Sequence, residues 1–491
     1  LRESQEENEM NFNFKTKPYK HQLTALEDSW SASFYALLME MGTGKTKVAL
    51  DTMVKLHEEK KITACLVVAP KGVYDNWIKN EIPTHVPTEV EPLILRWQPN
   101  FSKKYEDELS NFMFDQTAGR LKIFVINVEA FSTQKGTKIA HNFCKRHPKN
   151  LVIIDESTTI KNRKAARTKN IVSLNKFSKY RRILTGSPIT KSPMDLFSQC
   201  LFLDKKALGF ENYFAFQSRY SIVARRTMGN RSFQEITGYR RLDELTERLD
   251  KFSNRVLKRE CLDLPDKIYM RRDVELTDEQ LKLYRQMKKL ALAKLENGEL
   301  ATTQSVLTQI MRLQQICCGF LTPDDGQVQM LPSNRMKALS DVIEETSGKV
   351  IIWATYRHDI EKIVDMLAHD YGQNSVAGYY GSTKQDRRQE IIRIFQNPTS
   401  PLRFFVATAQ TGGFGITLTE ANTVIYYSNS YDLEIRLQSE DRAHRIGQKK
   451  AVTYIDLVAR GTIDEKILKA LRDKINIAST VLNENAMDWL T

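Results

Sequence analysis

The sequence predicts an α/β fold of two lobes, each with a parallel sheet that helices surround. Short runs of β-branched and aromatic residues alternate with helical patterns in two separate stretches, which is typical of parallel sheets. Between these stretches the pattern becomes mainly helical and highly charged. With 491 residues, the chain is too long for one ordinary hydrophobic core. We therefore expect an N-terminal lobe at 12–203 and a C-terminal lobe at 331–491. Between them we expect a mainly helical region at 204–330, which is either a third domain or a set of protrusions from the two lobes.

Short apolar runs supply the expected strands of both lobes. In the first lobe they occupy residues 34–38, 64–70, 123–127, 151–155 and 182–186. In the second lobe they occupy residues 349–353, 404–408, 423–427 and 453–457. The middle segment instead places leucines at helical spacing, at Leu242, Leu245 and Leu249. Each set of runs is sufficient for one sheet with helices on its faces.

Composition and charge narrow the class of protein. Hydrophobic residues make up 41% of the chain, which fits a globular protein, and no apolar run is long enough to cross a bilayer. The six cysteines form no CxxC pair and the eight histidines do not cluster with them, so we expect neither a zinc site nor a disulfide framework. The formal charge of +13 fits either a polyanionic partner such as nucleic acid or simple solubility.

A glycine-rich loop follows the first apolar run and precedes a helix-forming segment. It consists of Met41, Gly42, Thr43, Gly44, Lys45 and Thr46. Backbone N–H groups in such a loop face phosphate oxygens, while Lys45 adds a positive charge and Thr46 offers a hydroxyl to magnesium. Met39 stands where the longer GxxxxGK[ST] pattern has its first glycine, so the loop alone is a moderately specific signal.

Two carboxylates follow four consecutive apolar residues of an expected strand. Asp155 and Glu156 therefore lie at the carboxyl end of a buried strand, where open α/β sheets place their ligands. We expect Asp155 to hold magnesium through water and Glu156 to act as the general base on the attacking water. The turn at 185–188 closes the next strand with small hydroxyl residues. It either senses the state of the nucleotide or is an ordinary Gly-Ser-Pro turn.

A second phosphate-handling motif lies near the end of the chain. Gln438, Asp441, Arg442 and Arg445 are spaced so that they would share one face of a helix. Two arginines that project from one lobe toward a phosphate held by the other would form an arginine finger. We therefore expect Gln438, Arg442 and Arg445 to contact the nucleotide, and both arginines to be catalytic.

Two further segments contain candidate ligand contacts. Tyr19 or His21 could stack on a purine while the amide of Gln22 forms paired hydrogen bonds to its edge. A glycine-rich turn that includes Gly412 and Gly415 follows the run at 404–408. Glycines there allow close approach of the backbone to a phosphate, either of the nucleotide or of a nucleic acid.

The ordered series of motifs resembles the Swi/Snf-type ATPases of helicase superfamily two. The likeness extends from about Lys17 to Lys466 and is most diagnostic at 441–448, with further support at 41–46, 155–162 and 184–188. The resemblance implies two RecA-like P-loop lobes that bind ATP and Mg²⁺ between them. It also implies movement along duplex DNA without general separation of the strands. The chain departs from the family where Ser157 and Thr158 replace the usual Ala-His pair, which puts the coupling of hydrolysis to the turn at Thr185 in doubt.

The resemblance also implies a set of DNA contacts. In the first lobe these are Pro70, Lys71, Lys161 and Asn162. In the second lobe they are Gly381, Ser382, Thr383 and Thr408, to which the glycine-rich turn adds Gly412. Because such contacts address phosphates, we expect binding to double-stranded DNA to be independent of sequence.

These observations lead to one main functional hypothesis and two alternatives. We expect a DNA-stimulated ATPase that translocates on double-stranded DNA and remodels DNA or DNA-bound proteins, in the form of a compact motor without evident targeting domains. A strand-separating or annealing, fork-remodelling helicase would use the same lobes, and a nucleotide-gated DNA-binding scaffold would lack turnover. We expect a monomer on DNA with no membrane association. It would be cytoplasmic or nucleoid-associated, or nuclear in a eukaryote, and not secreted.

Overall fold

The computed structural model describes most of the chain. The described residues are 12–71, 73–114, 119–228, 231–261, 264–296, 303–322, 327–381, 383, 385–412 and 416–481. The chain divides into two compact units. The first comprises Leu1–Pro188, Met194–Tyr213 and Glu247–Cys261, and the second comprises Ile189–Pro193, Phe214–Thr246 and Leu262–Thr491.

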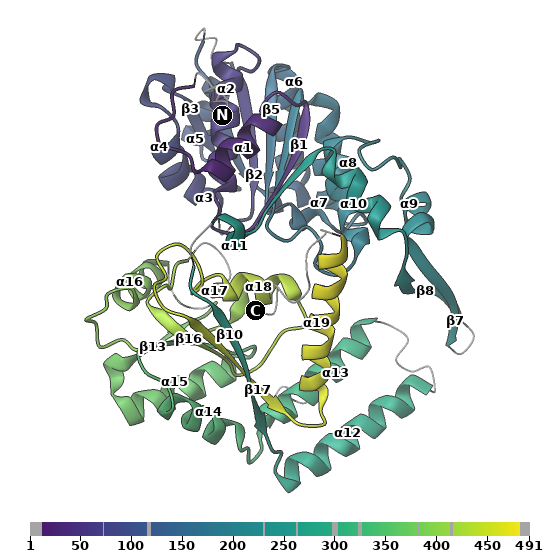
Figure 1. Cartoon of the computed structure of the whole chain (residues 1–491), viewed down its shortest axis with the longest axis vertical. Coiled ribbons are helices and arrows are strands. Elements are labelled where there is room, and N and C mark those ends of the chain that lie inside the picture. The colour runs from purple at the N-terminus through teal and green to yellow at the C-terminus, as the bar shows by residue number, and fades with distance from the viewer. Residues whose placement is uncertain are drawn as a thin grey trace, which may run out of the picture. The chain divides into compact units, whose positions relative to one another are not determined.

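The first unit contains a parallel sheet of seven strands in the order β3-β4-β2-β5-β6-β1-β9 (Figure 1). The strands are β1 (Phe34–Met39), β2 (Ala64–Ala69), β3 (Leu93–Arg96), β4 (Lys122–Asn127), β5 (Asn150–Asp155), β6 (Tyr180–Leu184) and β9 (Ser253–Val256). The central strands β2 and β5 are buried along their whole length, as expected for strands with helices on both faces. The five runs predicted as strands in this lobe are confirmed as β1, β2, β4, β5 and β6.

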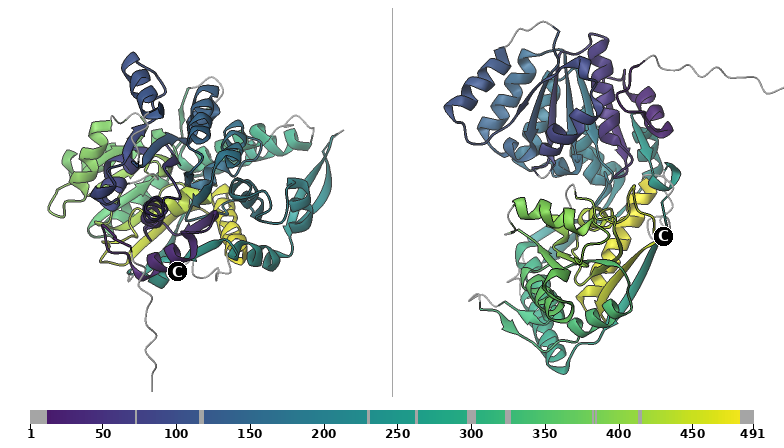
Figure 2. Two further views of the ribbon diagram at one scale, coloured as in Figure 1. Left: turned by 90° about the horizontal axis from the view of Figure 1, so that it is seen from above. Right: turned by 90° about the vertical axis from the view of Figure 1, so that its left-hand side faces the viewer.

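Helices cover both faces of this sheet, as the right-hand view of Figure 2 shows. The α-helices are α1 (Lys20–Ser29), α2 (Lys45–Glu58), α3 (Tyr74–Asn76), α4 (Ile82–His85), α5 (Lys103–Phe114), α6 (Gln134–Arg146), α7 (Ala166–Val172), α8 (Leu196–Leu203) and α11 (Lys258–Cys261). A π-helical turn, η1 (Trp77–Glu81), joins α3 to α4. Short 3₁₀ turns are η2 (Thr88–Val90), η3 (Val128–Ser132), η4 (Ser157–Ile160), η5 (Ser173–Phe177) and η6 (Pro193–Asp195).

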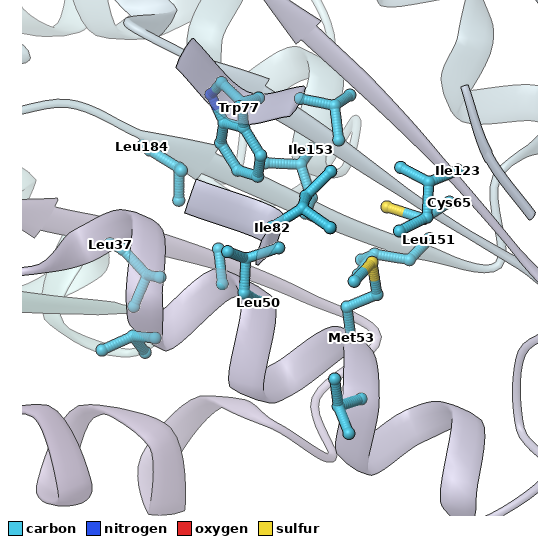
Figure 3. Close-up of a cluster of buried hydrophobic side chains, with 14 of the residues drawn as sticks. Leu37, Leu50, Met53, Cys65, Trp77, Ile82, Ile123, Leu151, Ile153 and Leu184 are labelled. Carbon is cyan, nitrogen blue, oxygen red and sulfur yellow. The ribbon is translucent and has the colours of Figure 1, made fainter. Parts of the chain in front are cut away.

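Two apolar layers hold the sheet of the first unit between its helices. On one face, Leu50 and Met53 of α2 and Trp77 of η1 pack with Ile123 and Ile153 of the sheet (Figure 3). The next residue along β4, Phe124, packs at a tilt against Phe112 of α5 and Phe143 of α6 instead, and these two rings stack on one another. This alternation follows from the two-residue period of side chains along a strand.

The second unit contains a parallel sheet of six strands in the order β10-β17-β16-β13-β15-β14. The strands are β10 (Lys267–Val274), β13 (Lys349–Trp353), β14 (Val376–Tyr379), β15 (Phe404–Ala407), β16 (Ala421–Tyr426) and β17 (Val452–Ala459). The surrounding elements are α12 (Asp278–Glu296), α13 (Thr303–Cys318), α14 (Arg335–Glu344), α15 (Arg357–Tyr371), η7 (Gln373–Ser375), α16 (Gln385–Phe395), α17 (Ala409–Gly412), α18 (Leu433–Glu440) and α19 (Ile463–Val481). The four strands predicted from the sequence are confirmed as β13, β15, β16 and β17. A two-stranded sheet consists of β11 (Phe320–Leu321) and β12 (Gln329–Met330).

The segment 204–330, expected to be a mainly helical insertion or protrusion region, contributes to both units. It contains α9 (Tyr213–Tyr220), an antiparallel pair β7 (Ser221–Met228) and β8 (Arg231–Tyr239), and α10 (Leu242–Asp250). Its strand β9 pairs with β1 in the first sheet, whereas its strand β10 pairs with β17 in the second. The boundary between units therefore falls inside this segment, because strands within it complete both large sheets.

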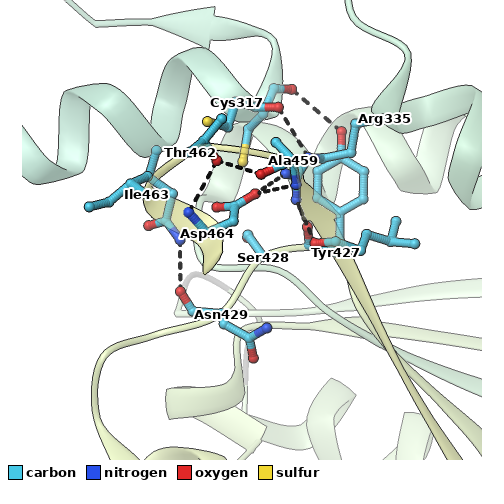
Figure 4. A network of polar contacts seen from close by, with 12 residues as sticks. Cys317, Arg335, Tyr427, Ser428, Asn429, Ala459, Thr462, Ile463 and Asp464 are labelled. Atoms are coloured by element: carbon cyan, nitrogen blue, oxygen red, sulfur yellow. Dashed lines mark hydrogen bonds and ion pairs between the residues drawn. The ribbon is translucent and has the colours of Figure 1, made fainter. Parts of the chain in front are cut away.

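A buried guanidinium connects several elements of the second unit. Arg335, at the start of α14, is fully buried and donates to the carbonyl oxygens of Cys317, Tyr427 and Leu457 (Figure 4). It also forms an ion pair with Asp464 in the first turn of α19. Arg335 thus connects α13 and α19 to the ends of β16 and β17. Among the helices of the described ranges, none combines the length and apolar character needed to cross a membrane.

Candidate functional site

The glycine-rich loop lies between β1 and α2, as the sequence predicted. Gly42 and Gly44 have φ angles of 85° and 89°, which favour glycine, and Lys45 is the first residue of α2. A β carbon at Gly44 would lie 2.1 Å from Nε2 of Gln22. The loop therefore requires glycine at this position both for its backbone angle and for the space that Gln22 occupies.

Helix α1 supports the loop through two side chains. Nε2 of Gln22 donates to the carbonyl oxygen of Thr43 at 3.0 Å, and Nε2 of His21 lies 2.8 Å from the same oxygen. Oε1 of Gln22 accepts from the backbone N–H of Tyr19 at 3.0 Å. Both ends of the Gln22 amide, which we expected to read a purine, thus hold the loop and the start of α1. Tyr19 is 55% exposed and stacks on His21 with a centroid distance of 5.8 Å.

The two candidate carboxylates lie at the end of β5 and are close to Lys45. Nζ of Lys45 is 3.6 Å from Oε1 of Glu156. Oδ2 of Asp155 accepts from the indole N–H of Trp77 at 2.8 Å, and Oδ1 accepts from the backbone N–H of Glu156 at 2.9 Å. Burial raises the pKa of Asp155, whereas the charge of Lys45 and the two donors oppose that shift. Glu156 has a φ of 46°, a strained angle for a residue other than glycine.

The donor set of the first unit fits magnesium held together with a nucleotide. Thr46 follows Lys45 in the first turn of α2, and Asp155 is an acidic residue at the edge where β5 ends. Within the described ranges, no group of three or more His, Cys, Asp or Glu residues could hold a metal ion. Magnesium in nucleotide sites commonly takes one or two protein oxygens, with phosphates and water as its other ligands. One hydroxyl and one carboxylate are therefore sufficient.

The strand end that carries the carboxylates is connected to the turn after β6. Oγ of Ser157 donates to Oε1 of Gln199 at 2.7 Å, and Nε2 of Gln199 donates to the carbonyl oxygen of Pro188 at 2.8 Å. Ser157 and Gln199 are fully buried. Ser157, one of the residues that departs from the family pattern, thus has a defined hydrogen-bond path to the turn at 185–188.

The arginine motif of the second unit differs from its predicted conformation. Helix α18 ends at Glu440, so Gln438, Asp441, Arg442 and Arg445 do not share a helical face. The backbone N–H of Arg442 contacts the oxygen of Ser439 at 3.4 Å instead of continuing the α-helical pattern. In a continued α-helix, the backbone oxygen of Gln438 would accept from the backbone N–H of Arg442. Here that oxygen accepts from the side-chain Nε of Arg442 at 3.0 Å. The helix is therefore closed by a side chain at this point.

The two arginines are still close to one another within the second unit. Nη1 of Arg442 donates to the carbonyl oxygen of Ile416 at 3.2 Å, and Nη1 of Arg445 contacts the same oxygen at 3.4 Å. Arg442 is 1% exposed, whereas Arg445 is only partly buried. Gln438 is buried, and its Nε2 lies 3.4 Å from Oε1 of Glu434. Gly415, expected to contact the nucleotide, lies outside the described residues.

A pocket of about 260 Å³ lies at the carboxyl ends of β13, β15 and β16 in the second unit. Its hydroxyl-bearing lining residues are Thr355, Thr408, Thr411, Tyr426, Ser428 and Ser430. Arg436 also lines the pocket, but its guanidinium is bonded to the carboxylates of Asp456 and Glu440. The pocket therefore presents hydroxyl groups and a neutralised arginine to whatever enters it.

The expected DNA contacts lie beyond the carboxyl ends of parallel strands. Pro70 and Lys71 follow β2, and Lys161 and Asn162 follow η4, which comes after the adjacent strand β5. Lys71 and Asn162 are exposed, Lys161 is partly buried and Pro70 is buried.

In the second unit the expected contacts follow two paired strands. Gly381 and Thr383 follow β14, Thr408 follows the neighbouring β15, and Gly412 ends α17. Nη2 of Arg388 donates to the oxygen of Gly381 at 3.1 Å. Ser382 lies outside the described residues.

Three residues of these sites were not predicted from the sequence. Trp77 binds a residue 78 positions away, so no local pattern connects it to Asp155. Gln199 lies within the mainly apolar segment Leu196–Leu203, where an amide signals a buried polar contact. Arg436 precedes the arginine motif and has the same side chain, but the structure places it in a buried ion pair with Asp456.

Comparisons with known proteins give consistent sequence matches. Residues 29–320 match the SNF2-related domain, and residues 334–447 match the helicase conserved C-terminal domain. The chromatin structure-remodeling complex subunit snf21 of Schizosaccharomyces pombe is 26% identical over 96% of this chain and 39% of its own length. The TATA-binding protein-associated factor MOT1 of Saccharomyces cerevisiae is 25% identical over 91% of this chain and 26% of its own length. The chain thus spans well under half the length of these relatives.

A solved structure is also similar to this chain. It is described as the Sulfolobus solfataricus SWI2/SNF2 ATPase core in complex with dsDNA, with 24% sequence identity and a TM-score of 0.42. The match covers 97% of this chain and 95% of that one.

Proposed function

Because residues 29–320 match the SNF2-related domain, the chain belongs to that family, and we propose that it is a DNA-stimulated ATPase that translocates along double-stranded DNA. The observation that supports this most is the group at the edge of the first sheet. There, a phosphate-binding loop, Lys45 and the carboxylates of Asp155 and Glu156 come together at the ends of two strands. This combination is the one that hydrolysis of a nucleoside triphosphate requires.

In this proposal, each candidate residue of the first unit has a separate chemical role. The loop 42–46 binds phosphate through its N–H groups, and Lys45 places a positive charge next to the transferred phosphoryl group. Thr46 and Asp155 would hold Mg²⁺, which neutralises charge on the phosphates when bound. Glu156 accepts the proton of the attacking water. Tyr19 offers an exposed ring on which the purine stacks, next to the Gln22 amide.

In the second unit, Arg442 and Arg445 would stabilise the charge that develops in the transition state. Arg445 is the better placed of the two, because Arg442 is almost completely buried by contacts of its own unit. Gln438 and Gly415 would complete the nucleotide contacts from this side.

Double-stranded DNA is the proposed partner, and the contacts are with its phosphates. Lys71, Lys161 and Asn162 in the first unit, and the turns after β14 and β15 in the second, come from strand ends of the two parallel sheets. Alternating grip by two such groups would produce directed stepping, and remodelling of a DNA-bound protein would follow from that movement. We propose that the active form is a monomer and that it acts in a compartment that holds DNA.

Steady-state phosphate release tests the proposal directly. The rate should rise at least about tenfold with duplex DNA and should not rise with Lys45→Ala. Displacement of the third strand from a triplex, with the duplex left paired, should accompany ATP hydrolysis. Unwinding of a tailed duplex without triplex displacement would instead identify a strand-separating helicase. DNA binding without any phosphate release would identify a nucleotide-gated scaffold.

A further inference from the structure

Trp77 occupies an unusual position in the first unit. It begins the π-helical turn η1, is fully buried, and lies in the apolar cluster with Ile82 and Ile153 (Figure 3). A buried indole needs a partner for its N–H group, and Trp77 donates to Oδ2 of Asp155 at 2.8 Å. π-helical turns are rare and are found frequently at functional sites. The ring thus packs as a core residue, while its one polar atom contacts a candidate metal-binding carboxylate.

The hydrogen bond fixes a group that would otherwise rotate. The terminal torsion of an aspartate is broad, so its two oxygens are not held in place by rotamer preference alone. Here Oδ2 accepts from the indole and Oδ1 accepts from the backbone N–H of Glu156 at 2.9 Å. Each oxygen retains a second lone pair for another ligand. The carboxylate of Asp155 is therefore oriented by two donors that belong to the chain itself.

The hydrogen bond from the Trp77 indole to Asp155 is also strong and shielded from water. A hydrogen bond to an ionised carboxylate is about twice as strong as one between neutral groups. Asp155 is 4% exposed and Trp77 is fully buried, so water does not compete at this contact. Lys45 contributes charge, but it forms its ion pair with Glu156, so it does not set the angle of the Asp155 carboxylate.

We propose that Trp77 is a positioning residue, whose indole N–H holds the Asp155 carboxylate in the orientation that retains Mg²⁺ with the nucleotide. The inference rests on the proposed function, because it assumes that Asp155 is the magnesium-binding carboxylate. Trp77 itself contacts neither metal nor nucleotide in this role. Its effect is therefore expected in the magnesium-dependent part of nucleotide affinity.

Trp77→Phe tests the role, because it keeps an aromatic ring and removes the donor. Binding of a fluorescent ATP analogue is measured with excess EDTA and with Mg²⁺, and thermal unfolding is followed in parallel. Affinity in EDTA should change less than twofold, whereas the gain in affinity on adding Mg²⁺ should fall about tenfold. Benzothienylalanine at position 77, which replaces the N–H with sulfur at nearly constant volume, should reproduce this loss without disturbing the core.

Trp353→Phe is the matched control. Trp353 is fully buried in the second unit, and its indole nitrogen has no hydrogen-bond partner within the described ranges. The same substitution there removes equal volume and no hydrogen bond, so the magnesium-dependent gain should remain. A second control is Asp155→Asn, to which Trp77→Phe should add no further loss of that gain, because Trp77 acts through Asp155.

The outcomes separate the two proposals. If Trp77→Phe and the benzothienyl variant lower affinity equally with and without Mg²⁺, Trp77 has only a packing role and the inference is wrong. The same conclusion holds if both variants keep the full magnesium-dependent gain. If the wild-type protein gains no affinity from Mg²⁺ at all, the magnesium site of the proposed function is wrong as well.

Discussion

Gly44→Ala should destabilise the nucleotide-binding loop by a predictable amount. The backbone of Gly44 has a φ of 89°, and an alanine in the left-handed region costs about 1–2 kcal/mol. The added β carbon would lie 2.1 Å from Nε2 of Gln22, so the Gln22 amide must move. It then loses its bonds to Thr43 and Tyr19, each of which contributes about 0.5–1.5 kcal/mol. The total is about 2–5 kcal/mol.

A double-mutant cycle separates the two causes. Gln22→Ala alone should lose only the two hydrogen bonds, and the double variant should lose those bonds once rather than twice. The two substitutions should therefore be less than additive by about 1–3 kcal/mol. Gly119→Ala is the control, because Gly119 has a φ of 92° but a β carbon there would meet nothing within 4 Å. That variant should show only the backbone term of about 1–2 kcal/mol.

Urea unfolding followed by tryptophan fluorescence is a suitable assay. Of the five tryptophans, Trp30, Trp77 and Trp97 lie in the first unit, so the signal reports mainly on the lobe that contains the loop. Affinity for a fluorescent nucleotide should fall in the same order as stability. Strict additivity of Gly44→Ala and Gln22→Ala, or equal effects of Gly44→Ala and Gly119→Ala, would refute the assigned role of Gln22.

Four further predictions concern the chemistry and stability of the two units. Glu156→Gln should abolish phosphate release and change nucleotide affinity less than about threefold, whereas Lys45→Ala should abolish phosphate release and also weaken nucleotide binding. Turnover above about a tenth of wild type in Glu156→Gln would contradict the general-base role. Arg445→Ala should lower turnover by about three orders of magnitude with DNA affinity in the absence of nucleotide unchanged; an equal loss of DNA binding would assign it to the DNA contacts. Arg335→Leu should lower the free energy of unfolding by about 3–5 kcal/mol, because its aspartate partner stays buried without a counter-charge; a denaturation midpoint near that of the wild type would disprove this. Burial raises the pKa of Asp359 to about 7, so the folded chain keeps a proton that the unfolded chain loses, and stability falls as pH rises from about 4 to about 7. Asp359→Asn should remove this dependence of Tm on pH between pH 5 and pH 8. An unchanged pH profile of Tm in that variant would exclude Asp359 as the source.

The sequence identified interior strands and missed edge strands, for a physical reason. The missed strands of the two large sheets are β3, β9, β10 and β14, and these are the four edges. Interior parallel strands are buried on both faces and appear as continuous apolar runs, as in Asn150–Asp155. The edge strands β3, β9 and β10 are partly exposed, so β9 reads as the polar segment Ser253–Val256 and β10 contains a pair of arginines. The edge strand β14 is mostly buried, but its apolar run is only four residues long and includes a glycine. The apolar runs from which we predicted strands therefore reflect burial on both faces of the sheet, not strand geometry.

For the candidate site too, some residues could be predicted from the sequence and others could not. Residues adjacent in sequence, such as Lys45 and Thr46, could be predicted because one loop presents them together. Trp77 and Gln199 could not, because their partners are brought near only by the sheet. The helical arrangement of the arginine motif was wrong because α18 ends at Glu440, where the backbone oxygen of Gln438 accepts from the side chain of Arg442 instead of from its N–H. Periodicity carries no information about such a competing donor.

The strand order of the second sheet has a consequence for synthesis on the ribosome. The edge strand β10 is the first strand of that sheet to be made, yet its only neighbour in the sheet is β17, the last. All other strands of the sheet are translated between them, and the aspartate that pairs with Arg335 emerges later still. The nascent second unit therefore keeps β10 without its strand partner until β17 has been made. Slow translation over 452–464 should prolong that exposure and increase aggregation of the nascent chain.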